Sequence, residues 1–355
     1  MFRILSLDGG GIRGAFTASL LAEVESRLEL PIGRYFDLVA GTSTGALIAA
    51  AIASGISANI IVELYEKKSG EIFKPRPKHK PKKWRHRLGM HFARPASKAT
   101  IGVPFDDFLQ SKYEAQPLRH AVEGVFGRQL IGDLKMCRLV IPAVDVSAGR
   151  TIVFKTPHLP NLTRDRHYRI SDVLMATTAA PTYFPHAPLG NGSMVDGGLW
   201  ANNPGMVAYT EAMKIRECAK RDCDPMFEFS DIHVLSIGTG EPRYSLSPPG
   251  ETAGLGWWGP RVFDIASISQ SQGTHFQLQY LLDDRYFRLN FDLPDPSWTL
   301  DSIKHLPELM HRGQTVAHEN LPRILDRFFT TTAPDFDSFE DCRAKQSSLP
   351  LGSAN

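Results

Sequence analysis

The serine at position 43 stands in a motif that could make it a nucleophile. It is the central residue of the pentapeptide Gly41 to Gly45, which matches the pattern G-x-S-x-G. An apolar run at residues 35–40 precedes the motif, and a second one at residues 46–53 follows it. A strand, a sharp turn and a helix in this order form a nucleophile elbow, which presents a serine hydroxyl at the end of a sheet. Gly41 and Gly45 would tolerate the strained turn and leave room for the helix. A plain glycine–serine loop is the alternative interpretation.

A second stretch with chemical potential contains three consecutive glycines, Gly9 to Gly11, between a predicted strand at residues 2–7 and a predicted helix that starts near Ala15. Backbone N–H groups in such a place suit an anion. Phosphate binding is one reading, but the Lys-Ser/Thr of a P-loop and the full G-x-G-x-x-G spacing are missing. An oxyanion hole for a tetrahedral intermediate is the other. A tight turn alone explains one glycine well and three poorly. Arg13 either bonds the carbonyls of this loop or faces a substrate phosphate.

A nucleophilic serine needs a base, and Asp196 is the best candidate in the sequence. The usual partner is a histidine held by a carboxylate, but the two histidines to consider, His186 and His275, lie in no recognisable motif. Asp196 follows a short apolar strand and precedes Gly197 and Gly198, which predicts an exposed position at a strand end. Such a carboxylate can accept the serine proton directly if it is desolvated enough to be basic. The alternative for Asp196 is an Asx turn.

Taken together, these motifs resemble the patatin-like phospholipase family. The resemblance covers roughly residues 2–240 and rests on the segments 8–14, 41–45 and 196–198, with further blocks at 178–184, 201–204 and 236–240. It implies that Ser43 is the nucleophile, that Asp196 is its partner in a Ser-Asp dyad, and that the amides of Gly9, Gly10 and Gly11 form the oxyanion hole. The implied reaction is phospholipase A-type cleavage of membrane phospholipid acyl esters through an acyl-enzyme, with no metal and no cofactor required for the chemistry.

A narrower resemblance is to the bacterial patatin-like phospholipase effectors of antiphage signalling. A patatin core close to the N-terminus and a chain of 355 residues are similar to these effectors. The resemblance implies activation by a cyclic dinucleotide and degradation of the cell's own membrane. The alternatives are a nucleotide-independent general lipid acyl hydrolase or esterase, and a non-catalytic lipid-binding or storage protein. The intact Ser43, Asp196 and glycine loop speak against the last of these.

The elements that must position these residues alternate between strand and helix along the chain, which predicts an α/β three-layer sandwich with a mostly parallel central sheet. Besides those already named, we expect strands at 138–146, 151–155, 194–196, 232–237 and 286–291. We expect helices at 57–68, 103–109, 171–181, 204–218, 263–282 and 306–329, the last with a break at Pro322. Residues 242–260 are rich in Gly and Pro and contain Trp257 and Trp258, which predicts a loop or a tip that touches a membrane.

Three regions follow from this pattern. We expect a catalytic core over residues 1–240 that carries a basic insert at about 70–100, and an extension over 241–330 that completes or regulates the core. Residues 331–355 are polar, and we expect a flexible tail there.

Composition narrows the class of protein. The chain is 42% hydrophobic and 22% charged, as in a soluble globular protein, and its net charge of +2 gives no strong field that would attract DNA. The four cysteines form no C-x-x-C pair, which favours reduced thiols in a cytoplasmic protein. We see no signal peptide and no apolar run of roughly 18 to 20 residues. The expected location is therefore cytoplasmic, with peripheral contact to a phospholipid membrane, the inner membrane, during activity. A homo-oligomer is compatible with these data.

The basic insert is the most unusual stretch in composition. From Lys74 to Lys98 there are ten Lys or Arg residues, three His residues and no acidic residue. Interleaved apolar side chains such as Trp84 and Phe92 suit an anionic lipid surface or a nucleotide-like ligand. A solvated loop without a specific partner is the alternative.

Neutralising the insert tests its affinity for lipid. Replacing six basic residues by Gln should weaken binding to anionic vesicles, because each cation near such a surface contributes about 1 kcal/mol. The six are Lys78, Lys80, Lys82, Lys83, Arg85 and Arg87. Co-sedimentation at low and high salt measures the effect, with neutral vesicles as the control. Unchanged binding at low salt would favour the plain loop.

Overall fold

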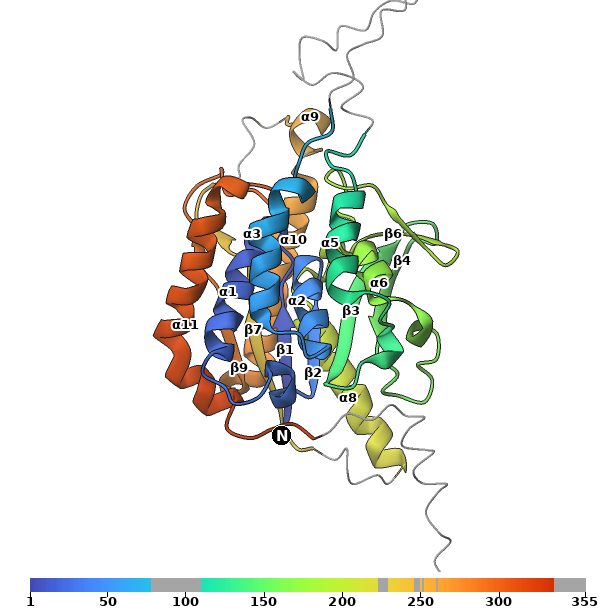
Figure 1. The fold of residues 1–355 in the computed structure, drawn as a ribbon, viewed down its shortest axis with the longest axis vertical. Helices are drawn as coiled ribbons and strands as arrows, with labels where there is room; N and C mark the ends of the chain where they lie inside the picture. Colours follow the sequence, from blue (N-terminus) through green and yellow to red (C-terminus); the bar gives the residue numbers. More distant parts are fainter. Residues whose placement is uncertain (78–109, 223–228, 246–249, 251, 260, 335–355) are drawn as a thin grey trace, which may run out of the picture.

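The structure is a computed structural model of the chain. It describes residues 1–77, 110–222, 229–245, 250, 252–259 and 261–334 (Figure 1). The helix predicted over 103–109 lies outside the described residues, and so does the basic insert from residue 78 onward.

A central sheet of eight strands runs through the described part of the chain, in the order β5-β6-β3-β2-β1-β7-β9 with β4 also paired to β3. The pairs β1–β2, β2–β3, β1–β7 and β7–β9 are parallel, whereas β4, β5 and β6 add antiparallel pairs at one end. The predicted mostly parallel sheet is therefore confirmed. The strands are β1 (Phe2–Leu7), β2 (Leu38–Gly41), β3 (Arg138–Asp145), β4 (Arg150–Lys155), β5 (Ala187–Leu189), β6 (Gly192–Asp196), β7 (Ile232–Ile237) and β9 (Tyr286–Leu289). A separate small sheet pairs β8 (Glu241–Pro242) with β10 (Asp292–Leu293).

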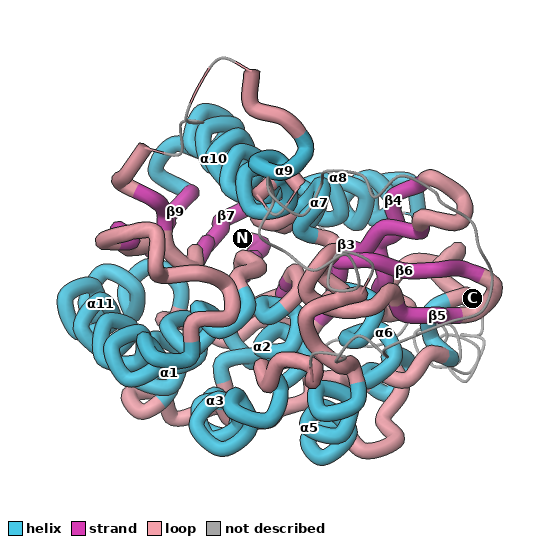
Figure 2. The backbone as a smooth tube through the Cα atoms, turned by 90° about the horizontal axis from the view of Figure 1, so that it is seen from above, coloured by secondary structure: helices cyan, strands magenta, loops and turns pink. Residues whose placement is uncertain are grey.

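Helices cover both faces of the sheet and make the predicted sandwich of three layers (Figure 2). One face is covered by α1 (Gly14–Glu25), α2 (Thr44–Ala53), α3 (Ala58–Ile72), α5 (Gln116–Phe126), α6 (Ile170–Thr177) and α11 (Leu306–Phe328). The other face carries α7 (Gly198–Ala201), α8 (Gly205–Asp222) and α10 (Val262–Leu282), and the short α9 (Leu255–Trp258) lies just before α10. Because both faces are covered, the central strands are buried throughout, as the six consecutive buried residues of β1 show.

Residues beyond 240 are integrated into this fold. Strand β9 extends the sheet by pairing in parallel with β7, and α11 packs against α1 (Figure 1). The ring of Phe328, at the end of α11, stacks on Phe36 with centroids 6.2 Å apart. The chain is still held just after α11, because Ala333 donates its amide to the carbonyl of Arg34 at 2.7 Å. The part of the predicted flexible tail that follows residue 334 lies outside the described residues.

Some local predictions were wrong. Helix α11 continues through Pro322 without the expected break. Pro322 lies on the exposed face of α11, where the carbonyl that it leaves unpaired can bond water, while Ile324 and Phe328 anchor the buried face. The strand expected at 35–40 also begins later, at Leu38, because Ile32–Tyr35 form a 3-10 turn. Trp257 and Trp258 belong to the short helix α9.

A substitution at Gly313 tests how closely α11 approaches α1. A Cβ atom at this position would lie 2.3 Å from the carbonyl oxygen of Phe16 in α1. Gly313→Ala should therefore push the two helices apart and lower the free energy of unfolding by about 1–3 kcal/mol. Gly124 in α5 is the matched control, because a Cβ there meets nothing within 4 Å, and Gly124→Ala should stabilise the helix by up to about 1 kcal/mol. Urea unfolding of both variants gives the answer, and equal shifts would contradict close packing at Gly313.

Candidate active site

Ser43 lies on a strained turn between β2 and α2. Its φ of 53° is positive, a conformation that residues other than glycine rarely adopt. Strand β2 ends two residues earlier and α2 begins at the next residue, so the strand, turn and helix expected around Ser43 are all present. Gly45 allows α2 to start this close to the sheet, because a Cβ there would lie 2.3 Å from the carbonyl oxygen of Leu7. This geometry is that of a nucleophile elbow.

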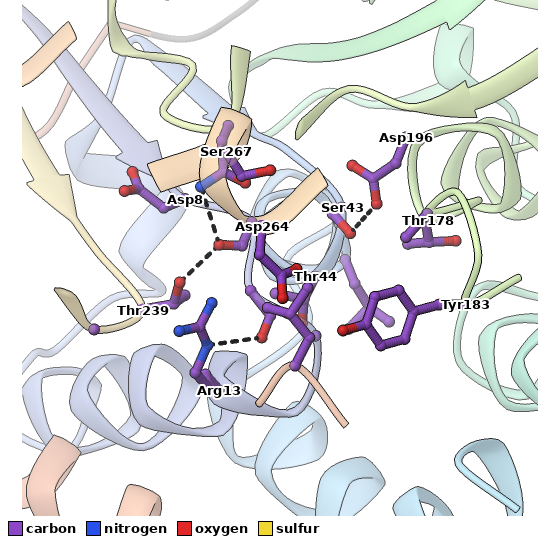
Figure 3. Close-up of a pocket in the computed structure, with 18 of the residues that line it drawn as sticks. Asp8, Arg13, Ser43, Thr44, Thr178, Tyr183, Asp196, Thr239, Asp264 and Ser267 are labelled. Atoms are coloured by element: carbon purple, nitrogen blue, oxygen red, sulfur yellow. Dashed lines mark hydrogen bonds between the residues drawn. The ribbon is translucent and has the colours of Figure 1, made fainter. Parts of the chain in front are cut away.

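The structure brings Ser43 and Asp196 together although 153 positions separate them. The Ser43 hydroxyl donates a hydrogen bond of 2.6 Å to Oδ2 of Asp196 (Figure 3). The other carboxylate oxygen, Oδ1, accepts the amide of Gly198 at 2.7 Å, which fixes the orientation of the carboxylate. The turn predicted as the alternative role of Asp196 is thus present alongside the contact with Ser43.

Asp196 is buried, whereas the sequence predicted an exposed strand end. Its side chain and backbone are only 1% exposed. The strand end is covered because α7 follows it directly and α10 packs on α7, with the ring of Phe263 against Gly198. Burial raises the pKa of Asp196 to about 7, although the hydrogen bonds from Ser43 and Gly198 act in the opposite direction. A carboxylate with this pKa is matched to taking up a proton near neutral pH.

The two histidines considered as bases lie elsewhere. Nδ1 of His186 bonds the hydroxyl of Ser193 at 2.8 Å, and Nδ1 of His275 bonds the hydroxyl of Tyr286 at 3.2 Å. In the described part of the chain, no histidine is hydrogen-bonded to Ser43 or Asp196. The hydrogen-bond partner that the structure gives Ser43 is therefore Asp196.

The glycine loop lies directly beside Ser43. A Cβ on Gly9 would come within 3.2 Å of the Cβ of Ser43, so a larger residue would crowd the nucleophile. The amide of Gly9 already donates to the carbonyl of Asn202 at 3.0 Å and is not free for an oxyanion. The amides of Gly10 and Gly11 have no acceptor among the described residues. Of the three amides predicted to form an oxyanion hole, these two are available.

Three side chains hold the glycine loop through its carbonyl oxygens. Nε of Arg13 donates to Gly10 at 3.4 Å, so Arg13 fills the first of the two roles considered for it. The hydroxyl of Thr239 donates to the carbonyl of Gly9 at 2.7 Å, and the side-chain amide of Asn202 donates to the same carbonyl at 3.4 Å. With its carbonyls held in this way, the loop is fixed beside Ser43 before any ligand binds.

Asp8 begins this loop, and the sequence did not reveal which residues hold its carboxylate. Its carboxylate receives two hydrogen bonds from Arg288 in β9, the shorter at 2.7 Å, and a third from Ser271 in α10 at 3.2 Å. Arg288 is an arginine within an otherwise apolar strand, Tyr286–Leu289, and this was the one available signal. Ser271 gave none, because a serine on a helix is ordinary.

Ser43 lies in the lining of a cavity that carries both apolar and polar side chains. The apolar ones suit an acyl chain and include Leu47, Leu64, Ile72, Phe73, Leu118 and Phe184. The polar ones include Arg13, Tyr183 and Asp264, which lie around Thr44 in Figure 3. Burial raises the pKa of Asp264, and its Oδ1 has no hydrogen-bond partner among the described residues.

Within the described residues, no group of three or more His, Cys, Asp or Glu side chains is arranged to hold a metal ion. Of the helices described, none has the length and apolar character needed to cross a membrane.

A nucleophile elbow, a Ser-Asp pair and a glycine loop on this sandwich define a serine hydrolase of the patatin type. In agreement, a model of the family "Patatin-like phospholipase" matches residues 5–209, more than half of the chain. The chain belongs to the patatin-like phospholipase family and is a lipid ester hydrolase. The family and the fold implied by the sequence motifs are thereby confirmed.

Two relatives are similar over nearly their whole length. The chain is 34% identical to the "cGAMP-activated phospholipase" of Vibrio cholerae over 361 residues, covering 94% of this chain and 96% of the relative. It is 33% identical to the protein of the same name from Pseudomonas aeruginosa over 358 residues, covering 99% and 94%. Among solved structures, VipD from Legionella pneumophila aligns with 87% of this chain and 66% of its own, at a TM-score of 0.39 and 10% identity.

The buried carboxylate predicts a pH dependence for Ser43. The rate of labelling by a fluorophosphonate should fall about tenfold per pH unit below pH 7, because Asp196, with a pKa of about 7, must be deprotonated to accept the serine proton. In Asp196→Asn, labelling should be slow at every pH. A rate that is independent of pH between 5 and 8 would contradict Asp196 as the base.

The same pKa predicts a gain in stability for Asp196→Asn. The folded pKa of about 7 lies above the ordinary value of 3.8, so the native state loses stability as pH rises from about 4 through 7. Asparagine cannot ionise, so Asp196→Asn does not lose this stability as the pH rises. Urea unfolding should show a variant that is more stable than the parent by roughly 1–4 kcal/mol at pH 8, with a smaller difference at pH 5.

Proposed function

We propose that the chain cleaves acyl esters of membrane phospholipids with Ser43 as the nucleophile and Asp196 as the general base. The hydrogen bond of 2.6 Å between them is the observation that supports this most strongly, because it joins a strained, accessible serine to a buried carboxylate. The apolar side chains of the cavity suit the acyl chain, and Gly9, Gly10 and Gly11 are among its lining residues.

In the first half of the reaction, Oγ of Ser43 attacks the ester carbonyl carbon while its proton passes to Oδ2 of Asp196. The negative charge on the former carbonyl oxygen is stabilised by the amides of Gly10 and Gly11. The carbon–oxygen bond to the leaving group then breaks, and Asp196 returns the proton to that leaving alkoxide. A lysophospholipid departs, and the acyl group stays on Ser43.

In the second half, a water molecule attacks the acyl-enzyme and gives a proton to Asp196. A second tetrahedral intermediate forms in the same oxyanion hole and collapses as the bond to Oγ of Ser43 breaks. The proton returns from Asp196 to Ser43, and a fatty acid leaves. All atoms and protons balance with water as the single co-substrate.

We further propose that a cyclic dinucleotide activates this hydrolysis in an antiphage response, with the protein acting at the surface of the inner membrane. Support comes from the relatives of Vibrio cholerae, Escherichia coli and Pseudomonas aeruginosa, each named a cGAMP-activated phospholipase and 33–38% identical to this chain. A nucleotide-independent lipid acyl hydrolase is the competing proposal.

Fatty-acid release from phospholipid vesicles tests the catalytic assignment of Ser43. Ser43→Ala should lower turnover by at least about 10³-fold, because no other group supplies the nucleophile. Ser26→Ala, which changes an exposed serine after α1, should be unaffected. Near-full turnover in Ser43→Ala would disprove the catalytic assignment.

The same assay with and without a panel of cyclic di- and trinucleotides decides the question of activation. We expect at least one cyclic dinucleotide to raise turnover of the parent chain and none to raise it in Ser43→Ala. Equal turnover under all conditions would remove the activation proposal and leave the hydrolase in place.

A further inference from the structure

Helix α10 is unusual because it lies at the periphery of the fold and yet carries almost no charge. From Ile265 to Leu282 its 18 residues include no Asp, Glu, Lys or Arg. A helix on the surface of a globular protein normally carries charged residues on its outer face. Figure 2 shows α10 on the outside of its layer, away from the centre of the sheet.

The outer face of α10 also exposes large apolar side chains. Tyr280 is 90% exposed, Phe276 67%, Val262 55% and Leu281 45%. Together with Trp258 in the preceding α9, they make up five of the ten exposed large hydrophobic residues in the described part of the chain. Scattered apolar residues need no explanation, but a cluster of this kind marks an interaction surface.

The inner face of α10 packs on the core through Leu278 and Leu282 and bonds residues around the active site. Ser267 donates to the carbonyl of Gly198 at 3.0 Å, and Ser271 donates to Asp8 at 3.2 Å. Oε1 of Gln270 accepts a hydrogen bond of 2.8 Å from the backbone N–H of Asn203. These contacts account for the polar residues of one face and leave the outer face without a partner among the described residues.

Positions on the outer face that are exposed or, at Ala266, half-buried recur every three or four residues and form one line, which we call the α10 stripe. The first half of the stripe carries the smaller side chains, and the second half carries the two large aromatic ones. The stripe consists of Val262, Ala266, Ser269, Gly273, Phe276 and Tyr280. Gly273 is at its middle, and a Cβ there would meet nothing within 4 Å.

This order makes the α10 stripe complementary to itself in the antiparallel direction. If two copies cross at Gly273, Tyr280 of each helix lies against Ala266 of the other, and Phe276 lies against Ser269. Large side chains then fill the space above small ones on both sides of a two-fold axis. An isologous interface of this type needs the same surface patch on both subunits.

The ends of α10 are complementary in charge in the same arrangement. Arg261 precedes the helix and is exposed, and the acidic pair Asp283 and Asp284 follows its last turn, also exposed. In an antiparallel pair, the basic end of one helix meets the acidic end of the other at both ends of the contact. A parallel pair would place like charges together.

We propose that α10 is a dimerisation surface and that its partner is α10 of a second copy of this chain, antiparallel across a two-fold axis at Gly273. A lipid surface fits the stripe less well, because anionic membranes are bound by clustered Lys and Arg. The stripe has no such residue, and it ends at two carboxylates.

Cysteine cross-linking at the axis tests this geometry directly. In Gly273→Cys the two new thiols face each other, so mild oxidation should form a covalent dimer at least about tenfold faster than in the parent chain, which contains four native cysteines. Gly70→Cys is the matched control, because Gly70 is also helical, exposed and open. Its cross-linking should stay at the parental level. Equal rates in the two variants would overturn the proposal.

Sedimentation of the parent and of charged variants gives an independent test. Phe276→Glu and Tyr280→Glu should each raise the dimer dissociation constant by about 10- to 100-fold, whereas Ile60→Glu, at an exposed site on α3, should not. A parent chain that stays monomeric at tens of micromolar, within the working range of the method, would contradict dimerisation. Loss of vesicle binding in Tyr280→Glu without any change in mass would show a lipid surface instead.

Discussion

The burial of one carboxylate is the condition on which the active site depends. Asp196 is enclosed between the end of β6, the short helix α7 and Phe263 of α10. Among the described residues, its carboxylate receives hydrogen bonds only from Ser43 and the backbone N–H of Gly198. Without solvent, the ionised form loses much of its stabilisation, and the carboxyl group becomes basic enough to take a serine proton. In the proposed mechanism, Asp196 therefore takes the place of a histidine. The same enclosure places the oxygen of Ser43 at 2.6 Å from its acceptor, so that one feature supplies both geometry and basicity.

The glycine loop depends on contacts from distant segments. Gly11 in this loop has a positive φ, which glycine adopts without strain, whereas the positive φ of Ser43 is strained and persists because its surroundings hold it. The loop is held by Thr239 and Asn202 at its carbonyls and by Arg288 and Ser271 at Asp8. Arg288 and Ser271 lie beyond residues 5–209, the part that matches the family model. Described residues from the C-terminal third of this chain therefore help to hold the glycine loop in place.

Helix α10 connects the active site with the outside of the molecule. Its inner face bonds both the glycine loop, through Asp8, and the turn after Asp196, through Gly198. Its outer face is uncharged and exposes large apolar side chains. A contact made on that outer face acts on a helix that touches both halves of the catalytic machinery, which gives self-association a direct physical route to the dyad.

Much of this protein was determined by the sequence itself. The order of strands and helices and the elbow around Ser43 follow from local patterns, which depend on neighbours within a few residues. The pairing of Ser43 with Asp196, 153 positions apart, was expected only because the motifs resemble one family. The continuous path of α11 through Pro322 did not follow, because packing on α1 outweighs the lost hydrogen bond. The burial of Asp196, the occupied amide of Gly9, the ion pair of Asp8 with Arg288 and the two faces of α10 were decided by tertiary structure alone. Each depends on segments that lie far apart in the sequence, and no local pattern records which of them will meet.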